Sequence, residues 1–437
     1  MKKIFQYIML AVVTIVMASC TSDIEETTAT TGKNNVQLVV GEFPAFGDSQ
    51  TRAIGTPDEG KISWAEGDEL LLVIDNTSYG SHSATFTYNG KSWELTSGEL
   101  VYREGDPAYI PHVYYAPNYK LANTSLMLKK SKAAGTDEYI EGKARITGNG
   151  ETITVSFAEA TRNYSRLRIA TMPNKPITVS INKYTPAGSS DMKWDQNYAL
   201  TSDEKGNAYL YGNFVTNSQF TVKYEEAPLA SHTFLQATVN AKSYALDATV
   251  VSLTDEGITY GQIVEDVKKE LDAGKTYINL ILAPDVDEET LEAIHIGLLE
   301  GDARDGSINL TLIGCKKIPS RGFMHFDMLK SIALPDVTEI EEKAFSDCTG
   351  LKKVVLGNLT KVYGNVGKKG IFDGCRTEDI DLVLSKDQKV MNGGKNEEGR
   401  YCWTADIIKD YSGSDEHNGR VFLDYDFQSI TCIYPVP

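Results

Sequence analysis

Apolar and polar residues alternate with a period of two in many short segments between Val36 and about Leu253. The clearest examples are Ile153/Val155/Phe157, Leu167/Ile169 and Phe220/Val222/Tyr224. This period is typical of strands with one buried face. Asn89-Gly90 separates two such segments and suits the positive backbone angles of a tight hairpin. Because no convincing amphipathic helix interrupts the region, we expect antiparallel β-sandwich architecture.

The length of this β-rich region is enough for two sandwich domains. We place the boundary near Met172-Pro173-Asn174, so that the first sandwich spans residues 36–172 and the second spans residues 173–253. The fold class predicted for the chain is therefore mainly β, with two antiparallel sandwiches preceding a different C-terminal part.

The pattern changes after residue 253, where apolar residues recur at helical spacing. One predicted helix presents Ile263, Val264, Val267 and Leu271 on one face and ends at Gly274. A strand is expected from Tyr277 to Leu282. A second helix is expected to begin at Asp287, a good N-cap residue, and to end before Gly301. Its apolar face carries Leu291, Ile294, Leu298 and Leu299.

An internal repeat of 22 residues follows the two predicted helices. Its columns are Leu312/Leu334/Leu356, Ile318/Ile340/Val362 and, after a five-residue insertion, Phe323/Phe345/Phe372. This period lies in the range of leucine-rich repeats. One 22-residue turn of such a repeat cannot bury its apolar face by itself. We therefore predict that the turns of residues 308–384 stack on one another as a right-handed solenoid. Cys348 and Cys375 then lie on successive turns and are expected to remain free thiols.

The segment from Ala344 to Leu356 resembles the BspA-type leucine-rich repeat of bacterial surface antigens. The resemblance implies that its Phe, Cys, Leu and strand residues point inward. Two positions depart from the repeat, since Phe326 replaces a cysteine and Glu378 stands where leucine is expected. We expect a helical cap and repeat solenoid over residues 254–390 and a C-terminal β cap over residues 391–437.

The N-terminus has the features of an export signal. Lys2 and Lys3 precede a short apolar stretch, and Met17-Ala18-Ser19-Cys20 resembles a bacterial lipobox. We therefore expect a signal peptide over residues 1–19, lipid on Cys20 and an acidic, Thr-rich tether over residues 20–35. The alternative is an ordinary secretory signal with an incidental cysteine. The acidic residues after Cys20 resemble the surface-export signal of Gram-negative lipoproteins, which implies the outward face of the outer membrane.

Several short motifs resemble the fimbrillin family of surface lipoproteins. They are Thr51-Arg52-Ala53, Trp64-Ala65-Glu66-Gly67-Asp68, Tyr114-Tyr115-Ala116-Pro117 and Ser165-Arg166-Leu167-Arg168-Ile169. The resemblance implies two β-sandwich domains. In pilus subunits of that family a protease cuts after an arginine near the mature start, which corresponds here to Arg52, and Val36 to Val40 is the strand that would leave. The alternative is that Arg52 is an ordinary loop arginine.

Composition excludes two classes of protein. Acidic residues outnumber basic ones 60 to 43, giving a net charge of −17, so we expect no nucleic-acid partner. The mean hydropathy of −0.28 excludes a protein with many membrane spans. The remaining class is a folded protein outside the membrane, held to it at most by its N-terminal lipid.

Motifs for catalysis and metal binding are missing from the sequence. The six histidines show no close ligand spacing, and the five cysteines after Cys20 form no C-x-x-C pair. Gly274-Lys275-Thr276 lacks the first glycine of a phosphate loop, and Asp285 starts no complete calcium loop. We therefore expect no enzyme activity, cofactor, metal or catalytic residue. Whether Cys402 pairs with Cys432 stays open.

Tyrosines are concentrated in one segment of the first predicted sandwich. They are Tyr102, Tyr109, Tyr114, Tyr115 and Tyr119. Such rings stack on sugars or anchor a protein partner, although tyrosine is also a good strand residue that packs within a sheet. Both interpretations remain open at this point.

The function expected from these features is adhesion or ligand binding at the bacterial cell surface. The expected partners are the membrane, through the lipid, and a protein or glycan of a host or neighbouring cell. Alternatives are an accessory or tip subunit of a fimbria joined by strand exchange, and a surface protein that captures glycans. We expect mainly monomers, because the C-terminal repeat occupies the place of a free donor strand.

Overall fold

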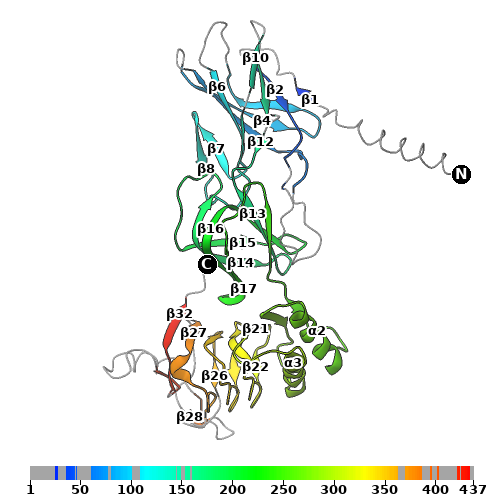
Figure 1. The fold of residues 1–437 in the computed structure, drawn as a ribbon, viewed down its shortest axis with the longest axis vertical. Helices are drawn as coiled ribbons and strands as arrows, with labels where there is room; N and C mark the ends of the chain where they lie inside the picture. The colour runs from blue at the N-terminus through cyan, green and yellow to red at the C-terminus, as the bar shows by residue number, and fades with distance from the viewer. Residues whose placement is uncertain are drawn as a thin grey trace, which may run out of the picture.

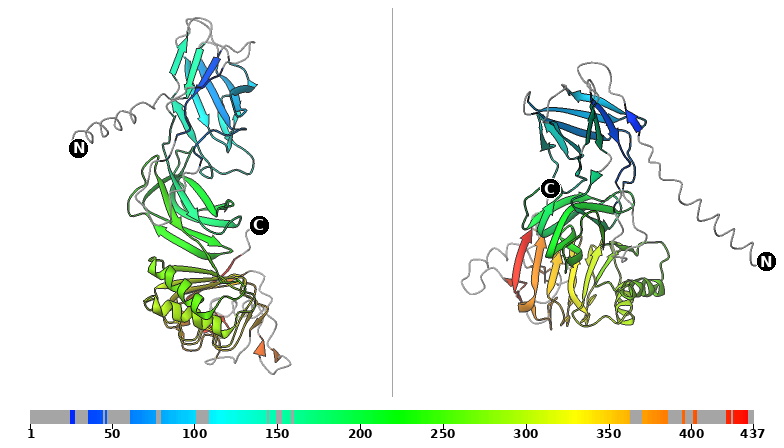
Figure 2. Two further views of the ribbon diagram at one scale, coloured as in Figure 1. Left: turned by 90° about the vertical axis from the view of Figure 1, so that its right-hand side faces the viewer. Right: turned by 45° about the horizontal axis from the view of Figure 1, so that its top comes forward.

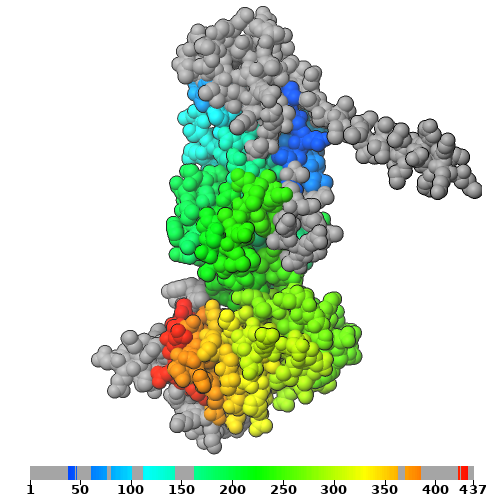
Figure 3. All heavy atoms as spheres, viewed as in Figure 1, coloured from blue at the N-terminus to red at the C-terminus, as the bar shows by residue number. Residues whose placement is uncertain are grey.

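The computed structural model describes residues 25–27, 36–44, 46, 61–76, 80–100, 109–143, 145–148, 153–157, 160–362, 370–385, 394–395, 401–402, 421–423 and 425–433. Cys20, Arg52 and Tyr102 lie outside these residues. The described chain is mainly β, with antiparallel sheets, one large parallel sheet and two α-helices. Three units follow one another along the long axis of the molecule, as the ribbon and the space-filling view show (Figure 1, Figure 3).

The first unit contains two sheets that share one hydrophobic core. One sheet has the order β1 (Glu25–Thr27), β2 (Val36–Val40), β11 (Ile153–Phe157), β10 (Arg145–Gly148). The other has the order β12 (Ala160–Thr161), β9 (Ile140–Lys143), β6 (Tyr109–Tyr115), β3 (Glu69–Asn76), β4 (His82–Tyr88), β5 (Trp93–Gly98). Leu38 and Val40 of the first sheet pack in one cluster with Leu70, Leu72 and Phe86 of the second. β4 shows the one buried face expected of an alternating strand, with Ala84 and Phe86 buried, whereas β3 is buried on both faces from Leu70 to Ile74.

Two hairpins complete the first unit. At the turn between β4 and β5 the Asn89 side chain accepts hydrogen bonds from the backbone of Lys91 (2.9 Å) and Ser92 (2.8 Å), and Gly90 has a φ of 90°. The predicted Asn-Gly hairpin is therefore confirmed. The second hairpin, β7 (Tyr119–Ala122) with β8 (Ser125–Leu128), points toward the second unit (Figure 1).

The second unit is one continuous sheet curled around a single core. Its order is β15 (Gln196–Thr201), β14 (Pro176–Pro186), β16 (Asn207–Tyr224), β13 (Ser165–Ala170), β18 (Ser243–Asp247), and β17 (Ala227–Thr233) also pairs with β16. β16 is long enough to pair with β13 at one end and with β17 at the other. The core includes Ile169, Val179, Leu210 and Phe220.

Two details of the β-rich half differ from the sequence-based expectation. The region is not purely antiparallel, because β2 pairs in parallel with β11 and β13 pairs in parallel with β18. In addition, β13 pairs only with strands of the second unit, so that unit begins before the boundary placed near Met172. The alternation of apolar and polar residues within a strand indicates which face of the strand is buried. It does not indicate which strand pairs with it or whether the pairing is parallel, and this explains both differences.

The third unit is built on a parallel sheet of seven strands. The order is β19 (Val251–Ser252), β20 (Tyr277–Ile281), β21 (Ile308–Ile313), β23 (Leu329–Leu334), β25 (Lys353–Leu356), β27 (Asp381–Ser385), β32 (Ser429–Ile433). A second, smaller parallel sheet contains β22 (Lys317–Ile318), β24 (Glu339–Ile340) and β26 (Lys361–Val362). Successive strands lie side by side from one end of the unit to the other (Figure 2). Two short hairpins, β28 (Gly394–Lys395) with β29 (Tyr401–Cys402) and β30 (Val421–Phe422) with β31 (Tyr425–Asp426), complete the unit.

Both predicted helices are present, at the β20 end of this sheet (Figure 1). α2 (Tyr260–Asp272) starts with a capping box in which Thr259 and Gln262 bond to each other's backbone. α3 (Glu288–Glu300) starts at Asp287, whose side chain accepts a hydrogen bond from Thr290 N at 2.8 Å. A Cβ on Gly297 would lie 2.8 Å from Val267 Cβ, so this glycine permits the close contact of the helices.

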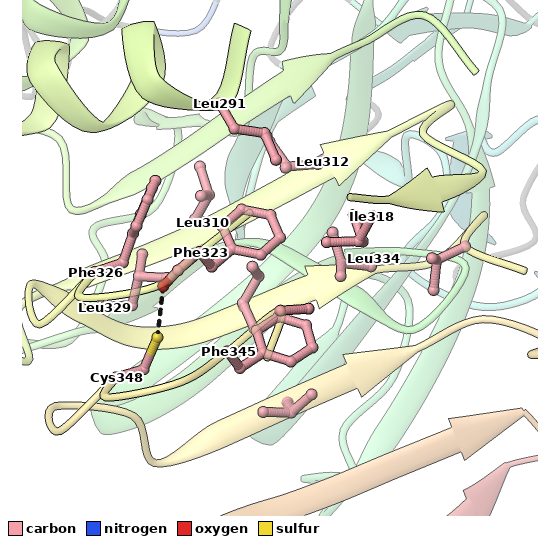
Figure 4. Packing of buried hydrophobic residues seen from close by; sticks show 14 of the residues in the cluster. Leu291, Leu310, Leu312, Ile318, Phe323, Phe326, Leu329, Leu334, Phe345 and Cys348 are labelled. Carbon is pink, nitrogen blue, oxygen red and sulfur yellow. Dashed lines mark hydrogen bonds between the residues drawn. The ribbon is translucent and has the colours of Figure 1, made fainter. Parts of the chain in front are cut away.

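The side chains in the three columns of the 22-residue repeat are all buried. Phe323, Phe345 and Phe372 are fully buried and stack with ring centroids 5.4 and 5.2 Å apart. Cys348 Sγ donates a hydrogen bond to Phe323 O of the preceding turn at 2.9 Å (Figure 4). Cys375 Sγ donates in the same way to Phe345 O, also at 2.9 Å. Cys348 and Cys375 are free thiols, as expected.

The two departures from the repeat have structural reasons. Phe326, at the cysteine position of the first turn, stacks on His295 of α3 with ring centroids 4.1 Å apart and so closes the gap between repeat and helix. Near Glu378 a short 3-10 helix, η1 (Thr377–Asp379), turns Glu378 to solvent and buries Thr377 and Ile380 instead. The degenerate turn therefore keeps an apolar interior with a different backbone path.

The second and third units are joined through β17, which lies on the parallel sheet. The Asn279 amide donates to Leu229 O at 2.9 Å, and the Thr311 hydroxyl donates to Pro228 O at 3.1 Å. Ala227 packs in one cluster with Ala333 and Val355 of the sheet. The outward face of the parallel sheet is thus covered in part by the second unit.

We predict that Phe345→Ala destabilises the third unit by about 3 to 5 kcal/mol, because the deletion leaves a cavity in the middle of the phenylalanine column. Chemical denaturation of the purified protein measures the change. Leu299→Ala is the matched control, since Leu299 is 50% exposed and its truncation is expected to cost less than about 0.5 kcal/mol. Equal effects of the two substitutions would contradict the buried column.

We also predict that the third unit loses stability as the pH falls below about 6.5. Burial against Phe326 lowers the pKa of the His295 imidazole from its ordinary value of 6.5. The unfolded state then binds more protons than the folded state in this range, so the free energy of unfolding falls with pH. Denaturation midpoints between pH 7.5 and 5 test this; His295→Gln should flatten the dependence, and His82→Gln, in β4 of the first unit, should leave the dependence of the third unit unchanged.

Candidate binding site between the first two units

The tyrosines singled out in the sequence have different environments. Tyr115 is only 5% exposed, and its hydroxyl donates to Asp68 at 3.1 Å, so it belongs to the core of the first unit. Tyr119 is buried as well. Tyr109 lies in β6, and its side chain is outside the described residues. Core packing therefore accounts for Tyr115. Tyr114 and Tyr119, in addition, both contact one further aromatic side chain.

That side chain is Tyr139, which sequence reasoning missed. Its ring centroid lies 5.8 Å from that of Tyr114 and 5.1 Å from that of Tyr119. Tyr139 immediately precedes β9 and lies where the first unit meets the second, in contact with the apolar clusters of both. Only the fold brings it to the earlier tyrosines, because it is distant from them in sequence.

A buried ion pair fixes the backbone beside Tyr139. Arg162 Nη2 lies 2.9 Å from Glu138 Oε1 and Arg162 Nε lies 3.0 Å from Glu138 Oε2, with side-chain exposures of 1% and 5%. The Tyr164 hydroxyl donates to the same carboxylate and accepts from the backbone N–H of Tyr139 at 3.1 Å. The bidentate geometry and the additional hydrogen bond satisfy both charges in the interior.

The same arginine holds the segment that follows β2. Its guanidinium donates to Pro44 O and lies 3.9 Å from the centroid of the Phe46 ring. The Arg166 guanidinium lies 4.6 Å from the centroid of the same Phe46 ring and 5.4 Å from that of Tyr209. These cation–π contacts hold the segment after β2 against the second unit.

Two glycines permit the close approach of the units. A Cβ on Gly135 would lie 2.9 Å from Tyr211 O, and a Cβ on Gly188 would lie 2.5 Å from the ring of Tyr139. Both glycines have positive φ, 83° and 78°, a conformation that favours glycine. Gly188 lies in the loop that follows β14, and Gly135 lies in the loop that precedes β9. Each loop can therefore contact the other unit without an intervening side chain.

A pocket of about 270 Å³ opens between these loops. Its described lining combines aromatic, amide and hydroxyl groups with a single ionisable acid. The lining residues are Tyr139, Glu141, Asn163, Tyr164, Thr185, Pro186, Ala187, Gly188, Ser189, Ser190 and Asn213. No lysine or arginine occurs among them. Pockets at domain junctions with a few placed polar groups are typical ligand sites.

One lining atom lacks a hydrogen-bond partner. The Asn213 amide donates through Nδ2 to Asn163 O at 2.9 Å, while its buried Oδ1 has no donor in the described structure. A buried acceptor without a donor is costly. Because this oxygen is itself buried, its missing hydrogen bond is a cost inside the protein and does not mark a contact for a molecule in the pocket.

The tyrosines of the site are hydrogen-bond donors at every physiological pH. Burial, with the nearby Glu141 carboxylate, raises the pKa of Tyr114 to about 12, and burial raises that of Tyr139 as well. Glu141 itself contacts His112 Nδ1 at 3.3 Å. The described lining thus offers hydroxyl and amide groups together with the Glu141 carboxylate.

No group of three or more His, Cys, Asp or Glu residues in the described part of the chain has metal-site geometry. No described helix combines the length and apolar character needed to cross a membrane. Burial raises the pKa of the Cys315 thiol to about 12, so this cysteine stays protonated within the repeat.

Comparison with known proteins gives structural matches only. No family model matches the chain, and no curated protein matches it. Among solved structures, the chain is similar to the crystal structure of a Bacteroides fragilis protein described as a "putative cell adhesion protein". The sequence identity is 11%, the TM-score is 0.28, and the match covers 54% of this chain and 95% of the other. At these values the similarity assigns neither a family nor an activity.

We predict that Arg162→Met destabilises the junction by about 3 to 5 kcal/mol, because it leaves the Glu138 carboxylate buried without its partner. Thermal unfolding and limited proteolysis near residue 138 measure the effect. Lys268→Met, which breaks the exposed Lys268–Asp272 pair on α2, is the control and should leave stability nearly unchanged. An Arg162→Met protein as stable as this control would show that the ion pair does not hold the units together.

Proposed function

We propose that the protein is a lipid-anchored bacterial surface protein that acts in adhesion by binding a ligand, without catalysis. The observation that carries the proposal is the pocket between the first two units, whose described lining combines tyrosine, amide and hydroxyl groups with the Glu141 carboxylate. Pockets at domain junctions with a few polar groups are typical places for ligand recognition. The N-terminal signal features and the lipobox-like Met17-Ala18-Ser19-Cys20 support the location.

The architecture supports the same proposal. We assign the first two units to a fimbrillin-like pair of β-domains and the third to a short leucine-rich-repeat solenoid capped by α2 and α3. Support for the solenoid comes from the parallel strands in 22-residue register, such as Ile332 with Val354, and from the stacked phenylalanines. Three units in a row place the pocket at a distance from the repeat (Figure 1).

The test of the proposed function is a binding screen of the ectodomain, residues 21–437, against arrays of glycans and extracellular-matrix proteins. Binding that saturates and is lost after heat denaturation supports an adhesive role. Absence of binding to every array member, together with turnover of any tested glycan or peptide, would replace adhesion by an enzymatic function.

We predict that Cys20→Ser releases the protein from the membrane fraction and abolishes labelling with radioactive palmitate. The reason is that acyl chains on Cys20 supply the membrane affinity, about 0.8 kcal/mol for each buried CH₂ group. Ser22→Ala, two residues away in the tether, is the control and should keep both properties. Unchanged labelling of Cys20→Ser would rule out the lipobox interpretation.

A fimbrial accessory subunit is the second candidate function. β2 favours it, because Leu38 and Val40 fill the core of the first unit from a strand that lies before Arg52, so cleavage there would leave this strand held without a covalent bond. β32 argues against a polymerising stalk, since this C-terminal strand is paired with β27 inside the third unit.

We therefore predict mainly monomeric protein on the surface. Whole-cell extracts run on gels without boiling should show a single band, and the band pattern should be the same for Arg52→Ala. Heat-resistant ladders that disappear in Arg52→Ala would instead establish assembly by strand exchange.

A further inference from the structure

We propose that the β7–β8 hairpin and the turn that follows it bind an acidic polysaccharide. The surface consists of Lys120, Lys129, Lys130 and Lys132 together with Met127, and we call it the lysine surface. None of these residues lines the pocket between the first two units. The inference therefore goes beyond the proposed function, because it names a second binding surface and the class of partner that fits it.

The hairpin region differs in charge from the rest of the chain. Residues 107–136 contain four lysines and neither Asp nor Glu, whereas the chain as a whole has a net charge of −17. The first acid after this range, Asp137, is only partly exposed. Exposed charges more than about 8 Å apart are largely screened at physiological ionic strength. A negatively charged ligand close to the hairpin is therefore attracted to it, although the protein is acidic overall.

The hairpin presents one of its faces to solvent. Leu121 pairs with Leu126, and both pack in one cluster with Leu71 of β3. Lys120 pairs with Met127 at the next position of the ladder. Because successive side chains of a strand point to opposite faces, Lys120 and Met127 point away from the first unit.

The turn after β8 gathers the other three lysines. The Lys129 backbone N–H donates to Asn118 O at 2.8 Å, which continues the hairpin beyond β8. The Lys132 N–H then donates to Lys129 O at 3.1 Å, and Ser131 between them has a φ of 65°. A residue other than glycine is uncommon in this conformation. The lysines of this turn, Lys130 included, repel one another, and a negatively charged ligand would relieve that repulsion.

The charges of the lysine surface are largely uncompensated. Among the described residues, Lys120, Lys130 and Lys132 are exposed and have no ion-pair partner. Lys129 pairs with Glu69 at 3.3 Å, but the two side chains are 37% and 44% exposed. Exposed ion pairs of this kind contribute little to stability. Lys129 can therefore exchange Glu69 for a ligand at small cost.

Exposed apolar side chains beside the lysines favour a polysaccharide as the ligand. Met127 is 53% exposed and Leu128 is 41% exposed. Sugar rings present apolar C–H faces between their charged substituents, so one chain can cover these side chains and also neutralise the lysines. An acidic peptide carries its charges on flexible side chains, whose ordering costs more conformational entropy.

A membrane surface fits the lysine surface less well. The hairpin lies where the first unit meets the second, between the two ends of the molecule (Figure 1). A bilayer is a wide plane, so its negative charge would also approach the acidic remainder of the chain. A single polysaccharide chain is narrow enough to follow the hairpin alone.

The test measures binding of the full ectodomain by isothermal titration calorimetry. The probes are heparin, a sulfated polysaccharide, and hyaluronan, a carboxylated one. We expect at least one of them to bind, with an affinity that falls steeply as NaCl is added, because binding releases counterions. Neutral dextran should not bind. Vesicles of phosphatidylglycerol and poly-glutamate are the competing probes, and each should bind more weakly than the better of the two polysaccharides.

Two triple variants with the same change in charge locate the binding. The lysine-surface variant carries Lys120→Gln, Lys130→Gln and Lys132→Gln. The control variant removes one exposed lysine from each unit, through Lys91→Gln, Lys205→Gln and Lys330→Gln. The first variant should lose affinity about tenfold or more, because its three charges act on one ligand, and the control should change less than about twofold. Circular dichroism and thermal unfolding establish that both are folded.

The other outcomes overturn the inference. Absence of binding to both polysaccharides does so, and so do equal affinities of the two variants, since the binding would then not depend on the lysine surface. Tighter binding of the vesicles or of poly-glutamate would assign the surface to a different class of partner.

These outcomes are distinguishable from a failure of the proposed function. Binding of another array member by an ectodomain that binds neither polysaccharide overturns this inference and leaves the adhesive function standing. Failure to bind both polysaccharides and every other array member overturns both.

Discussion

The burial of one guanidinium group determines how the first half of the molecule is arranged. Arg162 is almost fully removed from water, and a charge in that position is tolerated only when a carboxylate and further hydrogen bonds surround it. Glu138 lies in the loop before β9, and Pro44 lies in the segment after β2. Both segments of the first unit must therefore meet at Arg162, at the start of the second unit. The pocket exists because this convergence leaves Tyr139 and the loop at Gly188 face to face.

Local sequence patterns predicted the elements better than their connections. The repeat was visible because identical positions recur every 22 residues, and Phe323, Phe345 and Phe372 stack as that spacing requires. Helix ends were visible because capping is local, as at Asp287. The parallel pairings of β2 and β13 were not visible, because partner choice depends on contacts between residues more than 70 positions apart.

The same dependence on distant contacts explains why only part of the candidate site could be predicted. Tyr114 and Tyr119 were singled out by their density in the sequence, whereas Tyr139 and Asn213 carry no local signal and become neighbours of the pocket only through the junction.

In the third unit, other elements of the chain cover the short repeat at both ends and on one face. At one end, Phe326 and His295 bring the first turn against α3; toward the other, β32 adds a further parallel strand to β27. On the outward face, β17 places backbone carbonyls where Asn279 and Thr311 can donate to them. Part of the sheet surface that a repeat protein offers to partners is therefore occupied within the chain. The charged turns, where Lys361 pairs with Glu339 at 2.8 Å, lie outside this contact.

The parallel pairing of β2 with β11 would have a mechanical consequence under the proposed function, in which the protein is anchored at its N-terminus and binds a ligand at the junction. Tension enters β2 at Val36 and leaves β11 beyond Phe157, toward Arg162 and the pocket. In this geometry the force runs along the two strands in opposite senses, so their hydrogen bonds are sheared together instead of being opened one after another. Rupture under load is governed by the rate of unfolding rather than by equilibrium stability. A first unit that resists shear in this way would stay folded, and its ligand would stay bound, under a brief force such as that of flowing liquid on an attached cell.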